Sequence, residues 1–434
     1  MGPLKIAEVT LGCRSNAFDT ASILDQVRKK KDVSIVNPSE NPDFILINTC
    51  SVTDGAERDC RKAIKKLKKH NPQAQFIVTG CYAQLSPTEV ADKLGVDYVV
   101  GTSMQHLIPD IIISSLGDTK GRGNLFVENI MKQCPKIYDS ISSFVPHTRA
   151  FLKIQDGCNE FCTFCIIPFT RGRSRIVSHE VVIDEVNRLV DQGVKEIVLT
   201  GIHLGDYRKL VELICDISNK TKLKRLRLSS IEPFDVTNEL LDCLQDTSIF
   251  MPYFHLPLQS GDDVILDKMG RPYTTRYFEK LISQITTRFP NAFIGLDVMV
   301  GFPGEDEESF EKTWKFLGSI EWSKAHVFPY SKRSGTKAAG FDDQVSPEFK
   351  KGRVSRIIGL SNERLHHFYK SHCGKTHEVL VESVKGTMAK GLTPNYIPVE
   401  FESSSVAKNQ ILPIFLNTPL STRVCLGIDI SSHQ

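Results

Sequence analysis

Short apolar runs alternate with helical patterns over the first part of the chain, which we assign to residues 1–117. The runs 6–11, 44–47 and 76–78 each stop just before a cysteine, namely Cys13, Cys50 and Cys81. Helical periodicity follows at 20–29 and 56–69. Strands that alternate with helices predict a parallel sheet, and ligands of such sheets gather beyond the carboxyl ends of the strands. We therefore expect the three cysteines to converge.

The same alternation resumes over 147–372, after a connector at 118–146 in which Pro135 and Pro146 interrupt any periodic pattern. Apolar runs predict strands at 151–155, 196–200, 225–229, 253–258, 292–300 and 324–330. Helices are predicted at 181–191, 210–218, 238–244, 275–287 and 308–317, and a charged helix at 347–369 leads out. Six β/α units predict a partial (β/α)6 barrel, with its chemistry at the carboxyl ends of the strands.

The last segment, 373–434, changes character, because helical periodicity gives way to β-branched residues and the turn signal Thr393-Pro394-Asn395. This pattern predicts a small all-β barrel. The fold class is therefore α/β: an N-terminal parallel-sheet domain, a central partial barrel and a small C-terminal all-β barrel. A length of 434 residues suits about three domains.

Composition and the lack of targeting segments indicate where the protein is located. Hydrophobic residues make up 41% and charged residues 24%, as is ordinary for a globular protein, and a net charge of +3 is compatible with a nucleic-acid partner without requiring one. We see neither a signal peptide nor an apolar run long enough for a membrane span, so we expect a cytoplasmic protein without membrane contact. Clustered cysteines in a reducing compartment are more often metal ligands or catalytic groups than disulfides.

The strongest chemical signal is the run Asp156-Gly157-Cys158-Asn159-Glu160-Phe161-Cys162-Thr163-Phe164-Cys165. Its Cys-x3-Cys-x2-Cys spacing can place three thiolates around one iron–sulfur cluster. A four-iron cluster needs four ligands, so three cysteines leave one iron open to a small ligand. A zinc site is the alternative, but structural zinc sites close with a fourth Cys or His, and none follows nearby.

This triplet resembles that of the radical S-adenosylmethionine superfamily. The resemblance implies that the open iron chelates the amino and carboxylate groups of S-adenosylmethionine. It also implies that one electron from the cluster splits the sulfonium to give a 5′-deoxyadenosyl radical. Phe164, just before the third cysteine, fits the superfamily pattern and is a candidate cofactor contact, with a core phenylalanine as the other interpretation.

The motifs around Cys13, Cys50 and Cys81 resemble the N-terminal, Rossmann-like domain of the methylthiotransferases, a family within that superfamily. The resemblance continues through 152–175, 197–203, 228–233, 256–261, 297–305 and 326–333. It implies two [4Fe-4S] clusters, one held by Cys13, Cys50 and Cys81 and the other by Cys158, Cys162 and Cys165. It also implies a TRAM-like barrel at 373–434.

Within that family, Thr200-Gly201-Ile202-His203 and the segment 326–333 resemble the subgroup that acts on N6-threonylcarbamoyladenosine in tRNA. The implied reaction places a methylthio group on C2 of this nucleoside, beside the anticodon. No side-chain acid or base usefully ionises an aromatic C2–H at neutral pH, so the hard step belongs to the cofactor. The implied partners are tRNA, an external electron donor and a sulfur donor, and we expect a monomer.

Strand ends supply further candidates for contact with cofactor or substrate. Gly201 would let the backbone approach the methionine part of the cofactor, and a turn glycine is the alternative. Arg227, Ser229 and Asp297 are candidate contacts, as are Ser230 and Gln259. The remaining cysteines show no ligand spacing and are assigned no role: Cys60, Cys134, Cys215, Cys243, Cys373 and Cys425.

A basic helix at 57–70 is the candidate RNA contact, with Arg58, Arg61, Lys62, Lys65, Lys66, Lys68 and Lys69. Such a face can track phosphates, although a solvated surface is the usual interpretation. Arg171, Arg173 and Arg175 are candidates for binding RNA or cofactor charge. The segment 373–434 carries few lysines or arginines, so its sequence gives it little electrostatic hold on RNA.

Two kinds of alternative stay open. The same chemistry can serve isopentenyladenosine in tRNA or an aspartate of a ribosomal protein, although the motifs favour threonylcarbamoyladenosine. A protein of another class, a non-catalytic iron–sulfur protein that binds RNA, would not cleave S-adenosylmethionine.

Overall fold

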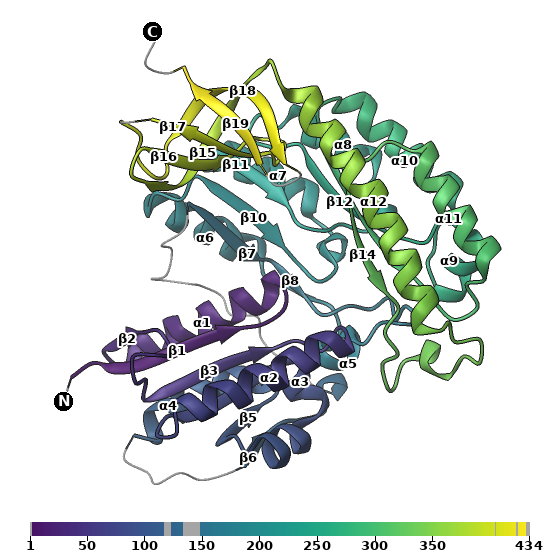
Figure 1. The fold of residues 1–434 in the computed structure, drawn as a ribbon. Coiled ribbons are helices and arrows are strands. Elements are labelled where there is room, and N and C mark those ends of the chain that lie inside the picture. Colours follow the sequence, from purple (N-terminus) through teal and green to yellow (C-terminus); the bar gives the residue numbers. More distant parts are fainter. Residues whose placement is uncertain (1, 117–122, 133–147, 404, 422–423, 431–434) are drawn as a thin grey trace.

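The computed structural model describes the whole chain except residues 1, 117–122, 133–147, 404, 422–423 and 431–434. It contains a parallel sheet with helices, a six-stranded partial barrel and a small closed β-barrel, in this order along the chain (Figure 1). The predicted fold class is thereby confirmed. Within the described part of the chain, no helix is both long and apolar enough to cross a membrane.

The N-terminal sheet has six parallel strands in the order β2-β1-β3-β4-β5-β6. Their bounds are β1 Leu4–Thr10, β2 Val33–Ile35, β3 Phe44–Thr49, β4 Gln75–Gly80, β5 Tyr98–Val100 and β6 Asn124–Phe126. One face carries α1 (Arg14–Lys30) and α4 (Ile108–Ser114), and the other carries α2 (Asp54–His70) and α3 (Cys81–Leu85). Apolar side chains fill both interfaces, so β3 is buried along its whole length.

Strand β6 pairs with β5, so part of the connector expected at 118–146 belongs to the N-terminal sheet. Strand β6 has only three residues, which is too short for a periodic pattern that would predict a strand. Its hydrogen-bonded pairing with β5 is what identifies it. The rest of the expected connector, 118–122 and 133–146 with Cys134, lies outside the described residues.

The central part has six parallel strands, in the order β7-β10-β11-β12-β13-β14. Their bounds are β7 Arg149–Lys153, β10 Glu196–Thr200, β11 Arg225–Leu228, β12 Tyr253–Gln259, β13 Phe293–Val300 and β14 Lys324–Pro329. Two three-stranded sheets meet at the isolated bridges Leu226–Phe250 and Ser230–His255. A short strand β8 (Gln155–Asp156) and helix α5 (Ile167–Arg171) follow β7.

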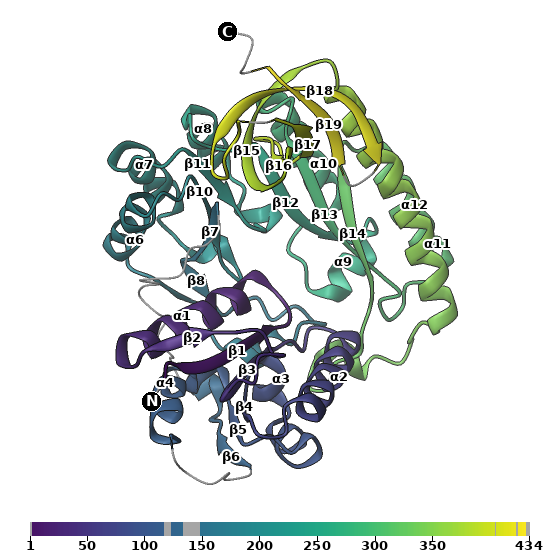
Figure 2. The same ribbon diagram turned by 60° about the vertical axis from the view of Figure 1, so that its left-hand side comes forward.

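Helices cover the outer face of the central barrel (Figure 2), namely α6 (His179–Asp191), α7 (Leu210–Lys220), α8 (Asn238–Asp246), α9 (Asp263–Met269), α10 (Thr275–Arg288) and α11 (Glu307–Ser319). Alternate strand residues such as Ile197, Leu226 and Leu296 belong to the core beneath these helices. The residues between them therefore face the lumen.

A long helix, α12 (Pro347–His372), leads to the C-terminal barrel. Its strands are β15 (Thr376–Lys385), β16 (Met388–Leu392), β17 (Pro398–Glu402), β18 (Ile411–Ser421) and β19 (Val424–Asp429). They close in the order β15-β16-β17-β19-β18 around apolar residues that include Val379, Val399 and Phe401. Closure leaves no strand edge unpaired.

Arg227 holds this barrel in place, which corrects its prediction as a cofactor contact. Its guanidinium is buried and donates to Glu196 Oε1 (2.8 Å), to the Thr393 carbonyl (3.0 Å) and to the Pro394 carbonyl (2.6 Å). Arg225 beside it donates to the Leu392 carbonyl (3.0 Å). Both arginines therefore bind the C-terminal barrel at the amino ends of the central strands, away from the carboxyl ends where ligands are expected.

A buried histidine at the end of α12 makes this contact sensitive to acid. His372 lies 3.1 Å, through Nε2, from Asn395 Nδ2, and its ring packs on Phe368 with centroids 4.7 Å apart. Burial lowers the pKa of His372 to about 4, and the charges of His377 and Lys375 add to the decrease.

We expect His372→Gln to reduce the loss of stability in acid. The pKa of His372 is lower in the folded than in the unfolded chain, so protonation favours unfolding as the pH falls from about 6.5 to about 4, by about 1–2 kcal/mol for a partly buried group. Urea unfolding at pH 7 and pH 4.5 measures this difference. His366→Gln, at an exposed position of the same helix, is the control. An equal acid dependence in both variants would contradict the assignment.

Candidate functional site

The cysteine triplet lies on the loop between β8 and α5, at the carboxyl end of the first central strands. Gly157 and Phe161 have positive φ angles, 76° and 50°, in the region that favours glycine. The Cys158 N–H donates to the Gly172 carbonyl (3.1 Å), which ties the start of the loop to the end of α5. The local fold thus brings the three thiols of one short segment into a constrained loop.

Burial changes the acidity of these thiols. It raises the pKa of Cys162 and raises that of Cys165 to about 12, and the neighbouring thiols of the triplet add to both increases. Arg271, just after α9, donates to Cys162 Sγ (3.3 Å) and opposes the increase at that thiol. Only thiolates bind metals well, so metal binding in this loop must release protons.

Gln155 joins the triplet loop to the loop that follows β10. Its Oε1 accepts from the His203 N–H (2.8 Å), and its Nε2 donates to the Gly157 carbonyl (2.7 Å). A Cβ on Gly201 would lie only 2.9 Å from Gln155 Oε1, so glycine is required here for close packing. This close packing gives Gly201 a structural role beside its predicted one as a cofactor contact.

His203 is a residue of this site to which the sequence analysis gave no role. Its Nε2 lies 2.7 Å from Asp235 Oδ2, and its Nδ1 lies 3.8 Å from Cys158 Sγ. Burial alone would lower the pKa of His203, but its hydrogen bonds to Asp235 and Cys158 raise it to about 11. The triplet therefore has a cation on each side, His203 near Cys158 and Arg271 near Cys162.

Two candidate contacts at strand ends have unpaired buried oxygens. Ser229 Oγ and Gln259 Oε1, at the carboxyl ends of β11 and β12, have no hydrogen-bond partner among the described residues. Gln259 also has a φ of 66°, a strained value for a residue other than glycine. Buried polar atoms normally have partners, so these two oxygens suit a bound polar ligand. Phe164 instead packs edge-on against Phe302, with centroids 6.4 Å apart.

Asp297 faces the lumen of the central barrel from β13. Its Oδ1 lies 2.9 Å from His255 Nε2, and the His255 and His326 rings lie with centroids 5.3 Å apart. Neither histidine had a predicted role. Their alternation with buried apolar residues such as Leu256 is the signal that places them in the lumen.

The three N-terminal cysteines lie at one edge of their sheet, because each follows a parallel strand. Cys13 precedes α1 and is exposed, Cys50 follows β3, and Cys81 begins α3. Burial raises the pKa of Cys50 and raises that of Cys81 to about 11, and the Cys13 thiol adds to both increases. Gly12 allows the loop before Cys13 to pack against Cys50, since a Cβ at position 12 would lie 2.9 Å from the Cys50 Cβ.

Asn16 fixes the loops that carry two of these cysteines. Its Nδ2 donates to the Leu11 carbonyl (2.9 Å) and to the Thr49 carbonyl (3.0 Å), which directly precede Gly12 and Cys50. Cys60, which had no predicted role, also lies here, with its Sγ 3.4 Å from the Cys50 amide nitrogen. Helix α2 brings Cys60 to this edge of the sheet, and spacing along the sequence gives no sign of that.

A buried ion network joins the two cysteine sites. Arg171 donates to Asp156 Oδ1 (3.1 Å), two residues before Cys158, and to Asp19 Oδ2 (3.1 Å) on α1. Arg171 also donates to Asn16 Oδ1, and Lys153 pairs with both aspartates. Arg171 is thus a structural cation between the two parts of the chain, which corrects its prediction as a contact for RNA or cofactor.

Cations outnumber carboxylates in this network, since Lys153, Arg171 and Arg175 surround Asp19 and Asp156. Burial by itself would raise the pKa of Asp156, but the charges of Lys153, Arg171 and Arg175 outweigh burial and hold it well below its usual range. Removing one member of a buried ion network leaves its partners without compensation, which typically costs about 3–5 kcal/mol.

We expect Arg171→Met to lower the free energy of unfolding by about 3–5 kcal/mol, because Asp19 and Asp156 would remain buried with only Lys153 and Arg175 as counter-ions. Urea denaturation followed by circular dichroism measures the change. Arg173→Met is the matched control, since the Arg173 side chain is exposed and lies over the Phe161 ring, a contact worth about 1 kcal/mol or less. Equal losses in both variants would rule out the network as the main link.

The predicted basic helix is α2, and most of its cations are at the surface. Arg58, Lys62, Lys65, Lys66 and Lys69 are exposed. Arg61 and Lys68 instead bind neighbouring groups, Arg61 beside Tyr82 and Lys68 at the Leu94 carbonyl. The start of α2 is held to the central barrel by Arg333, which pairs with Asp54 (2.6 Å) and Glu57.

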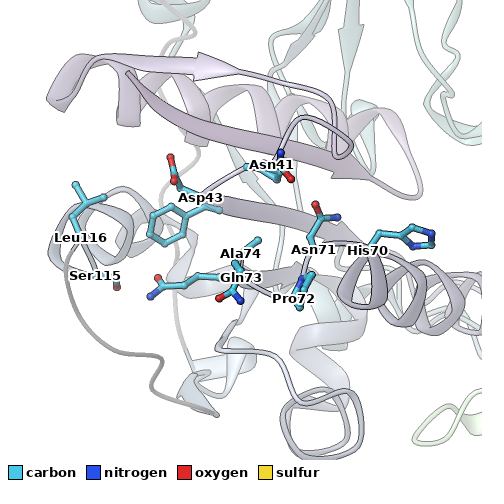
Figure 3. Close-up of a pocket in the computed structure, with 12 residues that line it drawn as sticks. Asn41, Asp43, His70, Asn71, Pro72, Gln73, Ala74, Ser115 and Leu116 are labelled. Carbon is cyan, nitrogen blue, oxygen red and sulfur yellow. The ribbon is translucent and has the colours of Figure 1, made fainter. Parts of the chain in front are cut away.

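The cavity in Figure 3 is separate from both cysteine sites. It has a volume of about 490 Å³ and is lined by residues that include Asp43, His70, Gln73 and Leu116. Asp43 and Gln73 precede β3 and β4, so the cavity opens at the amino ends of the strands, opposite to the cysteines.

The donor atoms at both cysteine sites are thiols. Within the part of the chain that the structure describes, no three His, Cys, Asp or Glu side chains meet closely enough to bind one metal ion. The N-terminal site offers three thiols from three loops, and the triplet site offers three thiols from one loop. Thiolates are the ligands that bind iron–sulfur clusters.

Comparison with known proteins agrees with this geometry. Residues 152–317 match the model of the Radical SAM superfamily, and residues 5–101 match an uncharacterized protein family, UPF0004. The radical S-adenosylmethionine methyltransferase TsrM from Kitasatospora setae aligns with a TM-score of 0.60 over 76% of this chain and 75% of that chain. At 15% identity this likeness concerns the fold alone. The central barrel is therefore a radical S-adenosylmethionine domain.

Relatives with higher identity cover nearly the whole chain. The threonylcarbamoyladenosine tRNA methylthiotransferase MtaB of Bacillus subtilis is 36% identical over 94% of this chain and 93% of its own length. MtaB of Aquifex aeolicus is 37% identical over 92% and 97%. The tRNA-2-methylthio-N(6)-dimethylallyladenosine synthase of Bartonella henselae is 31% identical over 97% and 95%. The chain belongs to the radical S-adenosylmethionine methylthiotransferase family.

Proposed function

We propose that this enzyme transfers a methylthio group to C2 of N6-threonylcarbamoyladenosine beside the anticodon of tRNA, with S-adenosylmethionine as cofactor. The observation that carries the proposal is the placement of two groups of three cysteines at the carboxyl ends of two adjoining parallel sheets, joined by the Arg171 network. Relatives that bear this activity in their names share 36% and 37% identity over most of the chain.

In this proposal Cys158, Cys162 and Cys165 hold one [4Fe-4S] cluster. When bound, that cluster supplies the electron that splits the sulfonium of S-adenosylmethionine. Arg271 and the charged His203 lie beside the thiolates and stabilise their negative charge. Their partners Glu232 and Asp235 fix the orientation of both cations.

Cofactor binding falls to the strand ends around the triplet. Ser229 Oγ and Gln259 Oε1 are buried oxygens available to the polar groups of S-adenosylmethionine. Gly201 keeps the loop after β10 close to Gln155 and so shapes the same wall. Phe164 supports the loop through Phe302, and Asp297 with His255 lines the lumen nearby.

Cys13, Cys50 and Cys81 hold the second [4Fe-4S] cluster, which serves sulfur delivery. Asn16 and Gly12 keep their loops together, and Cys60 supports the Cys50 backbone. Since Asn16 also binds Arg171, the sulfur site and the radical site keep a fixed relation. The target base must then reach a position between them.

The exposed cations of α2 provide a phosphate-binding surface for tRNA. Bases of an anticodon loop can leave their stack, which lets one base enter a protein site. An external electron donor and a sulfur donor complete the reaction. We propose further that the enzyme works in the cytoplasm, as a monomer.

Nucleoside mass spectrometry of tRNA from a strain that lacks the gene tests the proposed function. We expect 2-methylthio-N6-threonylcarbamoyladenosine to disappear and its precursor without the methylthio group to accumulate. A plasmid with the wild-type gene or Cys215→Ala should restore the product, and one with Cys158→Ala should not. Intact product, or loss of the isopentenyl derivative instead, would contradict the proposal.

Iron analysis of anaerobically purified protein tests the cysteine roles. We expect the triple variant of Cys158, Cys162 and Cys165 to alanine to keep roughly half of the iron and sulfide, since one of two clusters remains. It should form no 5′-deoxyadenosine from S-adenosylmethionine. The corresponding variant of Cys13, Cys50 and Cys81 should also keep roughly half of the iron but still form 5′-deoxyadenosine. Zinc alone in wild-type protein would refute both assignments.

A further inference from the structure

Arg14 extends from the N-terminal part of the chain toward the central barrel. It is the first residue of α1 and directly follows Cys13. Its guanidinium carbon lies 5.1 Å from the centroid of the Phe151 ring, and Phe151 is a lumen-facing residue of β7. Both ribbon views place α1 against the strands of the central barrel (Figures 1 and 2).

The charge of Arg14 also reaches the other side of the lumen. It lowers the pKa of Tyr253 on β12 and that of His326 on β14, although burial is the largest influence on each. Strands β7 and β14 are the two outer strands of the partial barrel. The Arg14 guanidinium therefore lies beside the lumen-facing ring of Phe151, on the sheet that contains β7.

Arg14 is half-buried. Among the residues that the structure describes, no carboxylate forms an ion pair with it. The lumen carboxylate of Asp297 is already held by His255 at 2.9 Å. The group that the guanidinium contacts is instead the aromatic ring of Phe151. A permanently charged guanidinium in such surroundings is well suited to an anionic group brought in by a ligand.

We propose that Arg14 binds the carboxylate of the threonylcarbamoyl group and thereby selects this nucleoside over one with an apolar N6 substituent. This inference rests on the function proposed above. Guanidinium and carboxylate can form two parallel charge-assisted hydrogen bonds. A dimethylallyl group, as in the names of some relatives at similar identity, offers no partner to the cation.

The position of Arg14 suits the geometry of the reaction. In adenine, C2 and C6 are separated by one ring nitrogen, so a group on N6 extends beside the C2 that reacts. Arg14 is adjacent to Cys13, which belongs to the proposed sulfur site. A base whose C2 faces that site can therefore bring its N6 substituent to the neighbouring residue.

The test uses two anticodon stem–loop RNAs that differ only in charge. One carries N6-threonylcarbamoyladenosine and the other carries its carboxamide, which is neutral and nearly the same size. Wild-type holoenzyme should bind the carboxylate RNA about 10- to 100-fold more tightly, the range for charge-assisted hydrogen bonds. Arg14→Gln should bind both RNAs equally, within about twofold, and Arg14→Lys should keep an intermediate preference. Fluorescence anisotropy at constant salt measures all three proteins.

Arg58→Gln is the matched control, because Arg58 is an exposed cation of α2. The Arg58→Gln variant should bind both RNAs more weakly by the same factor, so the ratio of the two dissociation constants should stay unchanged. Iron and sulfide are counted in every variant because Arg14 is next to Cys13. The preference is the ratio of the two dissociation constants measured on one protein sample. A difference in cluster content therefore changes the binding of both RNAs equally.

The two proposals fail in different ways. Holoenzyme that does not methylthiolate the threonylcarbamoyl RNA would overturn the proposed function. If wild-type enzyme is active on that RNA but Arg14→Gln prefers the carboxylate as strongly as wild type does, the role of Arg14 is wrong. Loss of the preference in Arg14→Gln, with both RNAs still bound, supports it.

Discussion

The pairing of Arg171 with Asp156 and Asp19 is the interaction on which the arrangement of both cysteine sites depends. Asp156 leads into the triplet loop, and Asp19 lies on the helix that begins after Cys13. Charges buried this deeply are tolerated only when they are paired. The network therefore permits one docking of the N-terminal sheet against the central barrel, and that docking sets the relation between the two sites.

The residues around this network share one function, which is to connect it to the loops of the two cysteine sites. Asn16 connects the network to the loops before Cys13 and Cys50, and Gln155 connects the strand of Asp156 to the loop of His203. A reaction that uses a radical at one site and sulfur at the other needs fixed geometry, because a misplacement of about 1 Å can cost 100-fold in rate. Packing and hydrogen bonds supply that geometry before any ligand arrives.

Much of this was predictable from the sequence, because the informative patterns are local. Strand–helix alternation predicted the three-part fold, and the spacing of Cys158, Cys162 and Cys165 identified the triplet without knowledge of their surroundings. The roles of arginines were not predictable in this way. Whether Arg227 reaches a ligand or the Thr393 carbonyl depends on a domain far away in the sequence. The same holds for Arg271, which contacts Cys162 only in the folded chain.

The attachment of the C-terminal barrel has a consequence for the evolution and engineering of such chains. Its Leu392, Thr393 and Pro394 carbonyls accept hydrogen bonds from Arg225 and Arg227, which are buried together with Glu196 inside the central barrel. Cutting the barrel away would remove these main-chain acceptors and leave two interior cations to share the Glu196 carboxylate. The C-terminal barrel is thus an integral part of the central core. A domain that replaces it must provide main-chain acceptors at the same positions.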